Sequence, residues 1–124
     1  MSTFSITFPL DPALHAHASG KWYDKAKPVK NAREMGYYLA IQERVRLTGR
    51  VRVFYRFEVP DRLRRDEANM IHHCKPVIDG VVDSGAIPGD HWEVLSIGGV
   101  ETAFVPSDNL VKQVMAVLRF EAME

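Results

Sequence analysis

Apolar and polar residues alternate in two segments of this chain, and each alternation predicts a β-strand. In residues 50–59, five apolar side chains alternate with mostly charged ones. Successive side chains of a strand point to opposite faces, so this pattern predicts one core face and one largely cationic face that carries Arg52 and Arg56. A shorter alternation over residues 4–8 predicts a first strand that Pro9 ends.

Two other segments place apolar residues at the three- to four-residue spacing of an α-helix. In residues 31–47 this spacing follows a pair that resembles a capping box, and Gly49 supplies a stop. Gly36 inside this segment costs about 1 kcal/mol relative to alanine. In the second segment Pro76 is placed to open a helix, because proline lacks an N–H that the first turn leaves unpaired anyway, and Gly85 ends it.

The remaining segments predict a long basic loop and two more strands. Residues 11–30 contain proline, glycine and four lysines without periodicity, which favours a loop. Strands are expected near residues 93–104 and 112–120, with a hairpin-like connection at 106–109. The order β-α-β-α-β-β predicts one α+β domain over residues 1–124, with two main helices and a small mixed or antiparallel sheet of about four strands.

Charge and cysteine content indicate which surfaces the protein presents and in which cellular compartment it works. The net charge is zero, but residues 1–65 hold thirteen Lys and Arg against six Asp and Glu, and residues 66–124 hold three against ten. This asymmetry predicts a basic surface beside an acidic pocket, unless folding interleaves the halves and their fields cancel. The single cysteine, Cys74, excludes an intramolecular disulfide and favours a reducing, cytoplasmic setting. We expect neither a membrane span nor a signal peptide.

A cluster of arginines in residues 60–91 suits contacts with phosphate. Arg62, Arg64 and Arg65 follow the predicted central strand, and a guanidinium group can engage two phosphate oxygens. The alternative is a solvated loop, or pairing of these arginines with the acidic half of the chain. The cations expected to contact a DNA backbone are Arg52, Arg56, Arg62, Arg64, Arg65, Lys21, Lys25 and Lys27.

Two aspartates stand at the ends of predicted elements, Asp66 after the arginines and Asp90 after the second helix. Carboxylates brought together repel each other unless a cation binds between them, and oxygen ligands favour Mg²⁺. Lys75 lies between them in the sequence and is placed to stabilise charge on a phosphate. The alternative interpretations are structural: Asp66 caps a helix, Asp90 fills a turn, and Lys75 pairs with Asp79 four residues on.

This order of motifs resembles the RusA-type Holliday-junction resolvases, small endonucleases of bacteria and their phages. S-I-T-F-P-L-D-P is similar to the family's first strand, P-D-R-L-R-R-D to its approach to the first catalytic aspartate, and K-P-V-I-D-G-V-V-D-S-G-A-I-P-G-D to its lysine-led helix and final acidic turn. The resemblance covers most of the chain. It implies an α+β homodimer that nicks four-way DNA junctions in pairs, with Mg²⁺ as cofactor and Mn²⁺ as a substitute. It makes Asp66 and Asp90 metal-binding catalytic residues and Lys75 the catalytic lysine.

The chain departs from the family pattern in its acidic motifs. The family usually has D-x-D-N, whereas residues 66–69 read D-E-A-N, so Ala68 replaces the second aspartate. About three additional residues precede Lys75, and a glycine precedes Asp90 where a second aspartate is common. The residues expected to compensate are Glu67, Asn69 and Asp79.

Three hypotheses follow for the function. The first is a Mg²⁺-dependent, structure-selective endonuclease for branched DNA in recombination, repair or phage DNA processing. The second, motivated by Ala68, is a junction-binding protein with weakened or no catalysis. The third is a small interaction domain whose basic loop binds an acidic partner.

Overall fold

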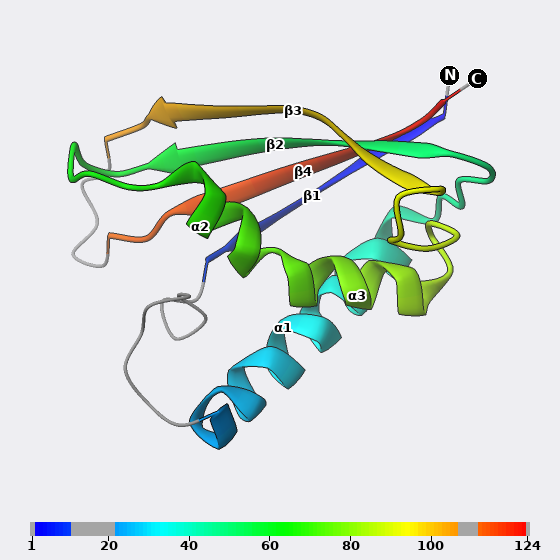
Figure 1. The fold of residues 1–124 in the computed structure, drawn as a ribbon, viewed down its shortest axis with the longest axis horizontal. Coiled ribbons are helices and arrows are strands. Elements are labelled where there is room, and N and C mark those ends of the chain that lie inside the picture. The colour runs from blue at the N-terminus through cyan, green and yellow to red at the C-terminus, as the bar shows by residue number, and fades with distance from the viewer. Residues whose placement is uncertain (1, 11–21, 107–111, 124) are drawn as a thin grey trace.

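A four-stranded sheet forms the centre of the protein (Figure 1). The structure, a computed structural model, describes residues 2–10, 22–106 and 112–123, and only the backbone of residues 22–26. The strands are β1 (Thr3–Pro9), β2 (Val51–Val59), β3 (Leu95–Phe104) and β4 (Met115–Ala122). They are arranged in the order β1-β4-β2-β3; β4 pairs antiparallel with β1 and with β2, whereas β3 pairs parallel with β2.

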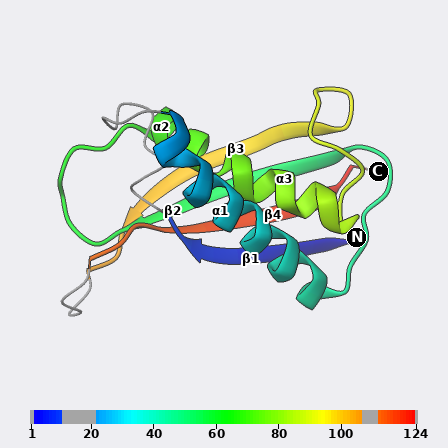
Figure 2. The ribbon, with the colours of Figure 1, turned by 90° about the horizontal axis from the view of Figure 1, so that it is seen from below.

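The helices lie on one face of this sheet, as Figures 1 and 2 show. They are α1 (Trp22–Glu43), α2 (Glu67–His73) and α3 (Lys75–Ser84). Only Cys74 separates α2 from α3, so together they occupy the place of the second predicted helix. The predicted α+β class and the order β-α-β-α-β-β are confirmed.

The first helix begins earlier and ends earlier than the sequence pattern predicts. Residues 22–30, predicted to be loop, form its first turns, with Pro28 inside; residues 11–21 lie outside the described part of the chain. Figure 1 shows these turns as the part of α1 that lies farthest from the sheet. A helix needs an apolar stripe only where it packs on a core, so the sequence of these turns lacks the helical spacing of apolar residues. At its other end the helix stops at Glu43, because Arg44 adopts a left-handed conformation with φ of 56°.

The predicted hairpin between the last two strands is wrong. β2 lies between β3 and β4, which therefore do not pair. The reason is burial: β4 contributes three fully buried side chains, Ala116, Leu118 and Phe120, and needs neighbours on both sides, whereas β3 is half exposed and suits an edge. Turn-forming residues mark a connection but do not select the strands that pair.

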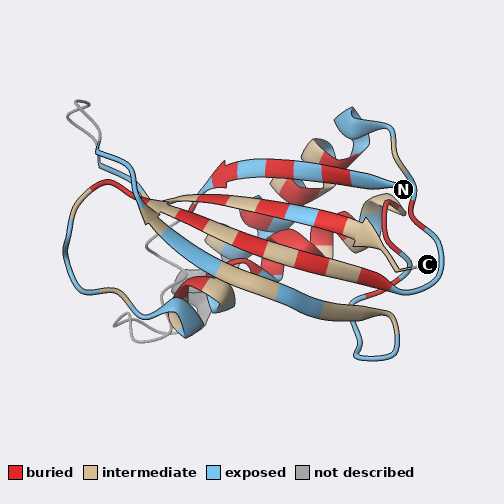
Figure 3. Cartoon of the chain, turned by 90° about the horizontal axis from the view of Figure 1, so that it is seen from above, coloured by how far each residue is buried: buried red, intermediate tan, exposed pale blue. Residues whose placement is uncertain are grey.

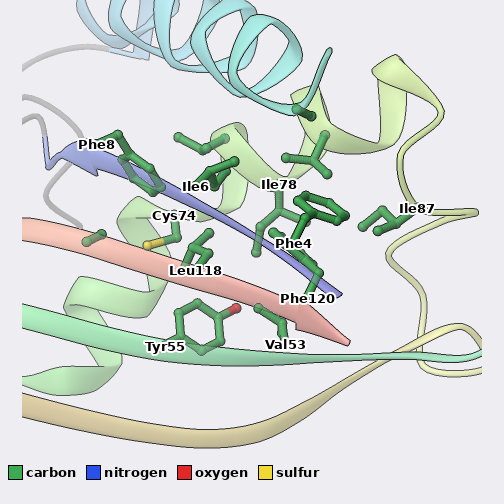
Figure 4. Close-up of a cluster of buried hydrophobic side chains, with 14 of the residues drawn as sticks. Phe4, Ile6, Phe8, Val53, Tyr55, Cys74, Ile78, Ile87, Leu118 and Phe120 are labelled. Carbon is green, nitrogen blue, oxygen red and sulfur yellow. The ribbon is translucent and has the colours of Figure 1, made fainter. Parts of the chain in front are cut away.

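The core fills the space between the sheet and the helices (Figure 4). Alternate residues of the strands point into it, and Figure 3 shows this alternation of buried and exposed positions. Phe4 and Phe120 stack across the β1–β4 pair with ring centroids 5.0 Å apart. From the helix side, Val77, Ile78 and Val81 of α3 complete the core. The described part of the chain contains no helix with both the length and the apolar character to cross a bilayer.

The two long helices cross with their backbones in contact at two glycines. A Cβ atom on Gly36 would lie 2.1 Å from the carbonyl oxygen of Val77, and one on Gly80 would lie 1.9 Å from the carbonyl oxygen of Arg33. No side chain fits at these distances, so glycine is required at both positions for this close approach. The contact explains why α1 tolerates the helix-weakening Gly36.

We expect Gly80→Ala to lower the free energy of unfolding by at least about 1–3 kcal/mol, because the added methyl group forces α1 and α3 apart. Urea unfolding monitored by circular dichroism measures this change. Gln42→Ala at an exposed position of α1 is the control and should change stability by no more than about 0.5 kcal/mol. Equal stability of Gly80→Ala and the unsubstituted protein would contradict the close crossing.

Candidate functional site

An ion-paired cluster on α3 brings together three of the predicted site residues. Lys75 opens the helix and Asp79 lies one turn later, so both are on the same face. The Nζ atom of Lys75 donates a hydrogen bond to Oδ1 of Asp79 at 2.7 Å and another to Oδ2 of Asp90. One ammonium group thus bridges two carboxylates that are eleven residues apart in the sequence.

The segment after α3 brings Asp90 back to the start of the helix. Gly85 ends α3 in the left-handed conformation, with φ of 83°, and its N–H bonds to the carbonyl of Val82. Ala86 and Ile87 are then buried in the core, at 3% and 1% exposure. The carbonyl of Ala86 also accepts a hydrogen bond from the backbone of Leu47 at 2.8 Å. The segment between α3 and Asp90 is therefore anchored in the core just before Asp90.

The cluster is charged and accessible to solvent. Partial burial lowers the pKa of Lys75, but the hydrogen bonds to Asp79 and Asp90 outweigh that effect, so the pKa is raised. The pKa of Asp90 is lowered, first by its hydrogen bond from Lys75 and further by a hydrogen bond with Asp79. The side chain of Lys75 is 56% exposed, so a bound phosphate can reach its ammonium group.

The donor atoms of this cluster fit a magnesium ion. Asp79 and Asp90 supply carboxylate oxygens, and Mg²⁺ commonly binds to one or two carboxylates while water and substrate phosphates complete its shell. Over residues 2–10, 22–106 and 112–123, no group of three or more His, Cys, Asp or Glu side chains is placed to hold a metal. Any ion at Asp79 and Asp90 would therefore depend on water or substrate for its other ligands.

Asp66 lies apart from this cluster, at the start of α2. It is the N-cap of that helix, where its Oδ1 accepts a hydrogen bond from the N–H of Ala68 at 2.9 Å. The structural interpretation of Asp66 as a helix cap is thereby confirmed. In the described chain, no hydrogen bond or ion pair joins Asp66 to Lys75 or Asp90.

The other two predicted ligands on α2 also point away from the cluster. Asn69 and Asp66 line a cavity of about 570 Å³ between α2 and the residues that directly precede β4. The carboxylate of Glu67 accepts a hydrogen bond from the hydroxyl of Thr102 on β3. Of the predicted metal ligands, Asp79 and Asp90 therefore belong to the cluster with Lys75. The others, Asp66, Glu67 and Asn69, lie outside it.

The loop between β2 and α2 presents two of its three arginines toward solvent. Arg65 donates to the carboxylate of Asp61 at 2.7 Å, and this bond, together with one from the N–H of Leu63, holds the pKa of Asp61 below its usual range. Arg62 lies over the ring of Phe104, 4.4 Å from its centroid. Arg64 is exposed at the rim of the cavity, and no described residue forms an ion pair with it. These contacts position the loop and leave cationic groups for an anionic ligand.

The outer face of the sheet is charge-balanced rather than cationic. Arg56 donates to Glu58 at 3.2 Å and to Glu101 at 2.7 Å, and these hydrogen bonds raise the pKa of Arg56. On β4, Arg119 pairs with Glu121, the residue that lies opposite Arg52 in the β2–β4 register. The prediction of a largely cationic face from β2 was wrong, because Glu58 of β2 and glutamates of β3 and β4 balance its arginines.

The predicted lysines are described only in part. Lys21 lies outside the described residues, and the side chain of Lys25 is not described. Lys27 is exposed on α1. By contrast, Lys112, which sequence reasoning missed, lines the cavity beside Asp66. No sequence signal connects these two residues, because only the pairing of β4 in the sheet places them together.

Comparisons with known proteins identify no family for this chain. No family model matches it, and no curated protein sequence matches it. Solved structures with some similarity include the hydrogenase maturation protein HypE in complex with ATP, with a TM-score of 0.37 and 12% identity over 98% of this chain and 30% of that chain. E. coli HypE gives a TM-score of 0.36 and 11% identity over 98% of this chain and 31% of that chain. The chain spans less than a third of these proteins, and the likeness is too weak to support an argument.

We expect Lys75→Met to raise the pKa of Asp90, because the substitution removes the hydrogen bond that lowers it most. Carbon-detected NMR titration of the aspartate carboxyl groups measures this shift. Lys30→Met, at an exposed position of α1, is the control and should leave the titration of Asp90 unchanged.

The same substitution should change the pH dependence of stability. A lowered folded-state pKa stabilises the protein above the unfolded-state pKa, and this stabilisation is lost as the pH falls through the folded-state pKa of Asp90. Lys75→Met should therefore be less stable than the unsubstituted protein at neutral pH and nearly equal to it in strong acid. A stability difference that does not depend on pH would contradict the proposed charge coupling.

Proposed function

We propose that this protein is a Mg²⁺-dependent endodeoxyribonuclease that nicks branched DNA, with four-way junctions as its main substrate. The observation that carries the proposal is the cluster of Lys75, Asp79 and Asp90, a solvent-accessible ammonium group between two carboxylates. The resemblance to RusA-type resolvases implies catalytic roles for Asp66, Lys75 and Asp90; the last two are in contact, whereas Asp66 caps α2. Chemistry and motif order therefore agree for Lys75 and Asp90.

The residues of the cluster match the needs of phosphodiester hydrolysis. In that reaction a water oxygen bonds to phosphorus, one ester P–O bond breaks, and the departing oxygen takes up a proton. Asp79 and Asp90 would hold Mg²⁺, which when bound polarises a phosphoryl oxygen and lowers the pKa of water. The lowered pKa keeps Asp90 ionised, as a metal ligand must be. The ammonium group of Lys75 stabilises the negative charge that develops on the phosphate oxygens.

Binding of DNA is proposed to depend on backbone contacts made by the loop before α2. Arg62 and Arg64 are its exposed arginines, and phosphate contacts carry no sequence information by themselves. Recognition would therefore be mainly of DNA shape and would weaken steeply with salt. A four-way junction has approximate two-fold symmetry, and a homodimer with two-fold symmetry would supply one site for each of two nicks.

The proposed setting is the cytoplasm of a bacterial or phage-infected cell, in recombination, repair or phage DNA processing. The single cysteine, Cys74, is a buried free thiol, which agrees with a reducing compartment.

A second candidate function is junction binding without cleavage. The observation that favours it is Ala68, which is exposed on α2 at the position where a carboxylate was expected. The nuclease and the binding protein differ in one measurable property, which is nicking in the presence of Mg²⁺ or Mn²⁺.

We expect Asp90→Asn to abolish Mg²⁺-dependent nicking of a labelled four-way junction while junction binding is retained, because the amide is a weaker, neutral ligand. Denaturing gels measure nicking, and mobility shifts measure binding. Asp83→Asn is the matched control: Asp83 lies on α3, which also carries Lys75 and Asp79, but its carboxylate pairs with Arg33 outside the cluster, so nicking should continue.

The outcomes of this assay separate the candidates. Nicking by Asp90→Asn at the rate of the unsubstituted protein would refute the site assignment. Tight junction binding with no nicking by the unsubstituted protein in Mg²⁺ or Mn²⁺ would favour the second candidate. Binding of neither junctions nor linear duplex at moderate salt would refute both.

The loop arginines and the sheet arginines should differ in their effect on DNA binding. Arg64→Ala should weaken junction binding and reduce the slope of log affinity against log salt by about 0.9, the value for one lost phosphate contact. Arg56→Ala should change that slope little, because its guanidinium group is already paired with Glu58 and Glu101. Titrations across a range of salt concentrations measure both slopes, and a larger change for Arg56→Ala would place the DNA on the sheet face instead.

A further inference from the structure

The cavity beside Asp66 has an apolar floor. It is lined by Leu10 at the end of β1, by Met70 of α2 and by Val114 before β4. Leu10 and Met70 are 7% and 5% exposed, so their side chains belong to the protein interior and form a fixed surface. The cavity volume of about 570 Å³ is in the range of pockets that bind small organic molecules.

The wall of the cavity is cationic. Arg64, Arg65 and Lys112 line it against one carboxylate, Asp66, whose Oδ1 is already bonded to the backbone of α2. Arg65 is held by Asp61, but in the described chain no ion pair engages Arg64 or Lys112. Two cationic groups therefore remain available at the rim for an anion.

Besides the charged groups, the polar lining of the cavity consists of two side-chain amides and the buried imidazole of His73. Asn69 and Gln113 both line the cavity, and a side-chain amide presents a donor and an acceptor side by side. This pair of groups matches the edges of nucleobases. The full set, an apolar floor, amides and two available cations, matches the parts of a nucleotide: the faces of the base, its edge and its phosphate.

A base inside a duplex cannot enter such a cavity, because its faces are covered by stacking and its edge by pairing. Unstacking costs least where a base is already poorly stacked or unpaired. At the branch point of a DNA junction the continuous stack is interrupted, so the bases there have fewer stacking neighbours than those within a linear duplex. The chemistry of the cavity therefore favours a nucleotide at a branch over one in continuous duplex.

We propose that this cavity binds one unstacked nucleotide of branched DNA, with its base on Leu10, Met70 and Val114 and its phosphate at Arg64 and Lys112. The inference rests on the proposed function and adds how branched DNA is distinguished from linear duplex. Binding in the cavity needs no metal, and it places one strand of the junction beside α2.

Two probes test this cavity. The first is a four-way junction that carries 2-aminopurine at a branch nucleotide, titrated with protein in EDTA; its fluorescence rises when the base leaves the stack. The second is a deoxynucleoside 5′-monophosphate titrated alone and followed by NMR. Val114→Phe fills the cavity, Arg64→Ala combined with Lys112→Ala removes its free cations, and Val29→Phe at an exposed position of α1 is the matched control.

We expect a fluorescence rise with the unsubstituted protein and with Val29→Phe, and none with Val114→Phe. Junction affinity should fall by about ten-fold with Val114→Phe, the size of one lost base contact, while linear duplex affinity is unchanged. The double alanine variant, which leaves the floor intact, should lose binding of the monophosphate. Urea unfolding of each variant confirms that it is folded.

The outcomes distinguish this inference from the proposed function. Tight junction binding without a fluorescence rise, or a rise that persists in both cavity variants, would refute the cavity inference and leave the nuclease proposal standing. Binding of the monophosphate in the cavity by a protein that binds no junction would refute the nuclease proposal and the role of the cavity in binding branched DNA. Binding of neither probe would refute both.

Discussion

The close crossing of α1 and α3 is the constraint on which the rest of the structure depends. Gly36 and Gly80 let the two backbones touch, and this contact fixes how deeply α3 sits against the sheet. Lys75 opens α3, and Asp90 returns to that end through a loop whose residues Ala86 and Ile87 are buried in the core. The geometry of the cluster is therefore set by backbone packing, because ion pairs between partly exposed side chains restrain a structure only weakly.

The two faces of the sheet have different roles that the strand pattern alone does not distinguish. One face builds the core, and on the other, viewed in Figure 3, arginines pair with glutamates of the same strand and of the neighbouring strand. A balanced face offers little net attraction to a polyanion. Arg64 and Lys112, which form no ion pair with a described residue, lie instead at the end of the sheet near α2. The same end carries the cavity, so charge and shape there favour one anionic ligand.

The sequence was informative where a structure is decided by residues close together in the chain. The alternation in residues 50–59 predicted β2, and Pro76 and Gly85 bounded α3, because strand periodicity and helix ends are local properties. The position of β3 and the neutralisation of Arg56 by Glu101 escaped prediction, because both depend on residues about 45 positions away. For the site, motif order grouped Asp66 with Lys75 and Asp90, but only Lys75 and Asp90 are in contact. The alternative interpretation of Asp66, as a helix cap, is the one that the structure shows.

The boundary between α2 and α3 connects the cavity with the cluster. Cys74 at this boundary is fully buried, and its Sγ–H donates to the carbonyl of Met70 at 3.5 Å. Met70 forms part of the cavity floor, and Lys75 of the ion-paired cluster follows Cys74 directly. The cavity floor and the cluster are therefore only five positions apart in the chain. Because burial raises the pKa of Cys74 to about 12, its thiol stays neutral and serves packing rather than chemistry. A DNA strand with one nucleotide in the cavity would thus lie at a fixed distance from Lys75. The fold would then set the distance between the branch point and the nick.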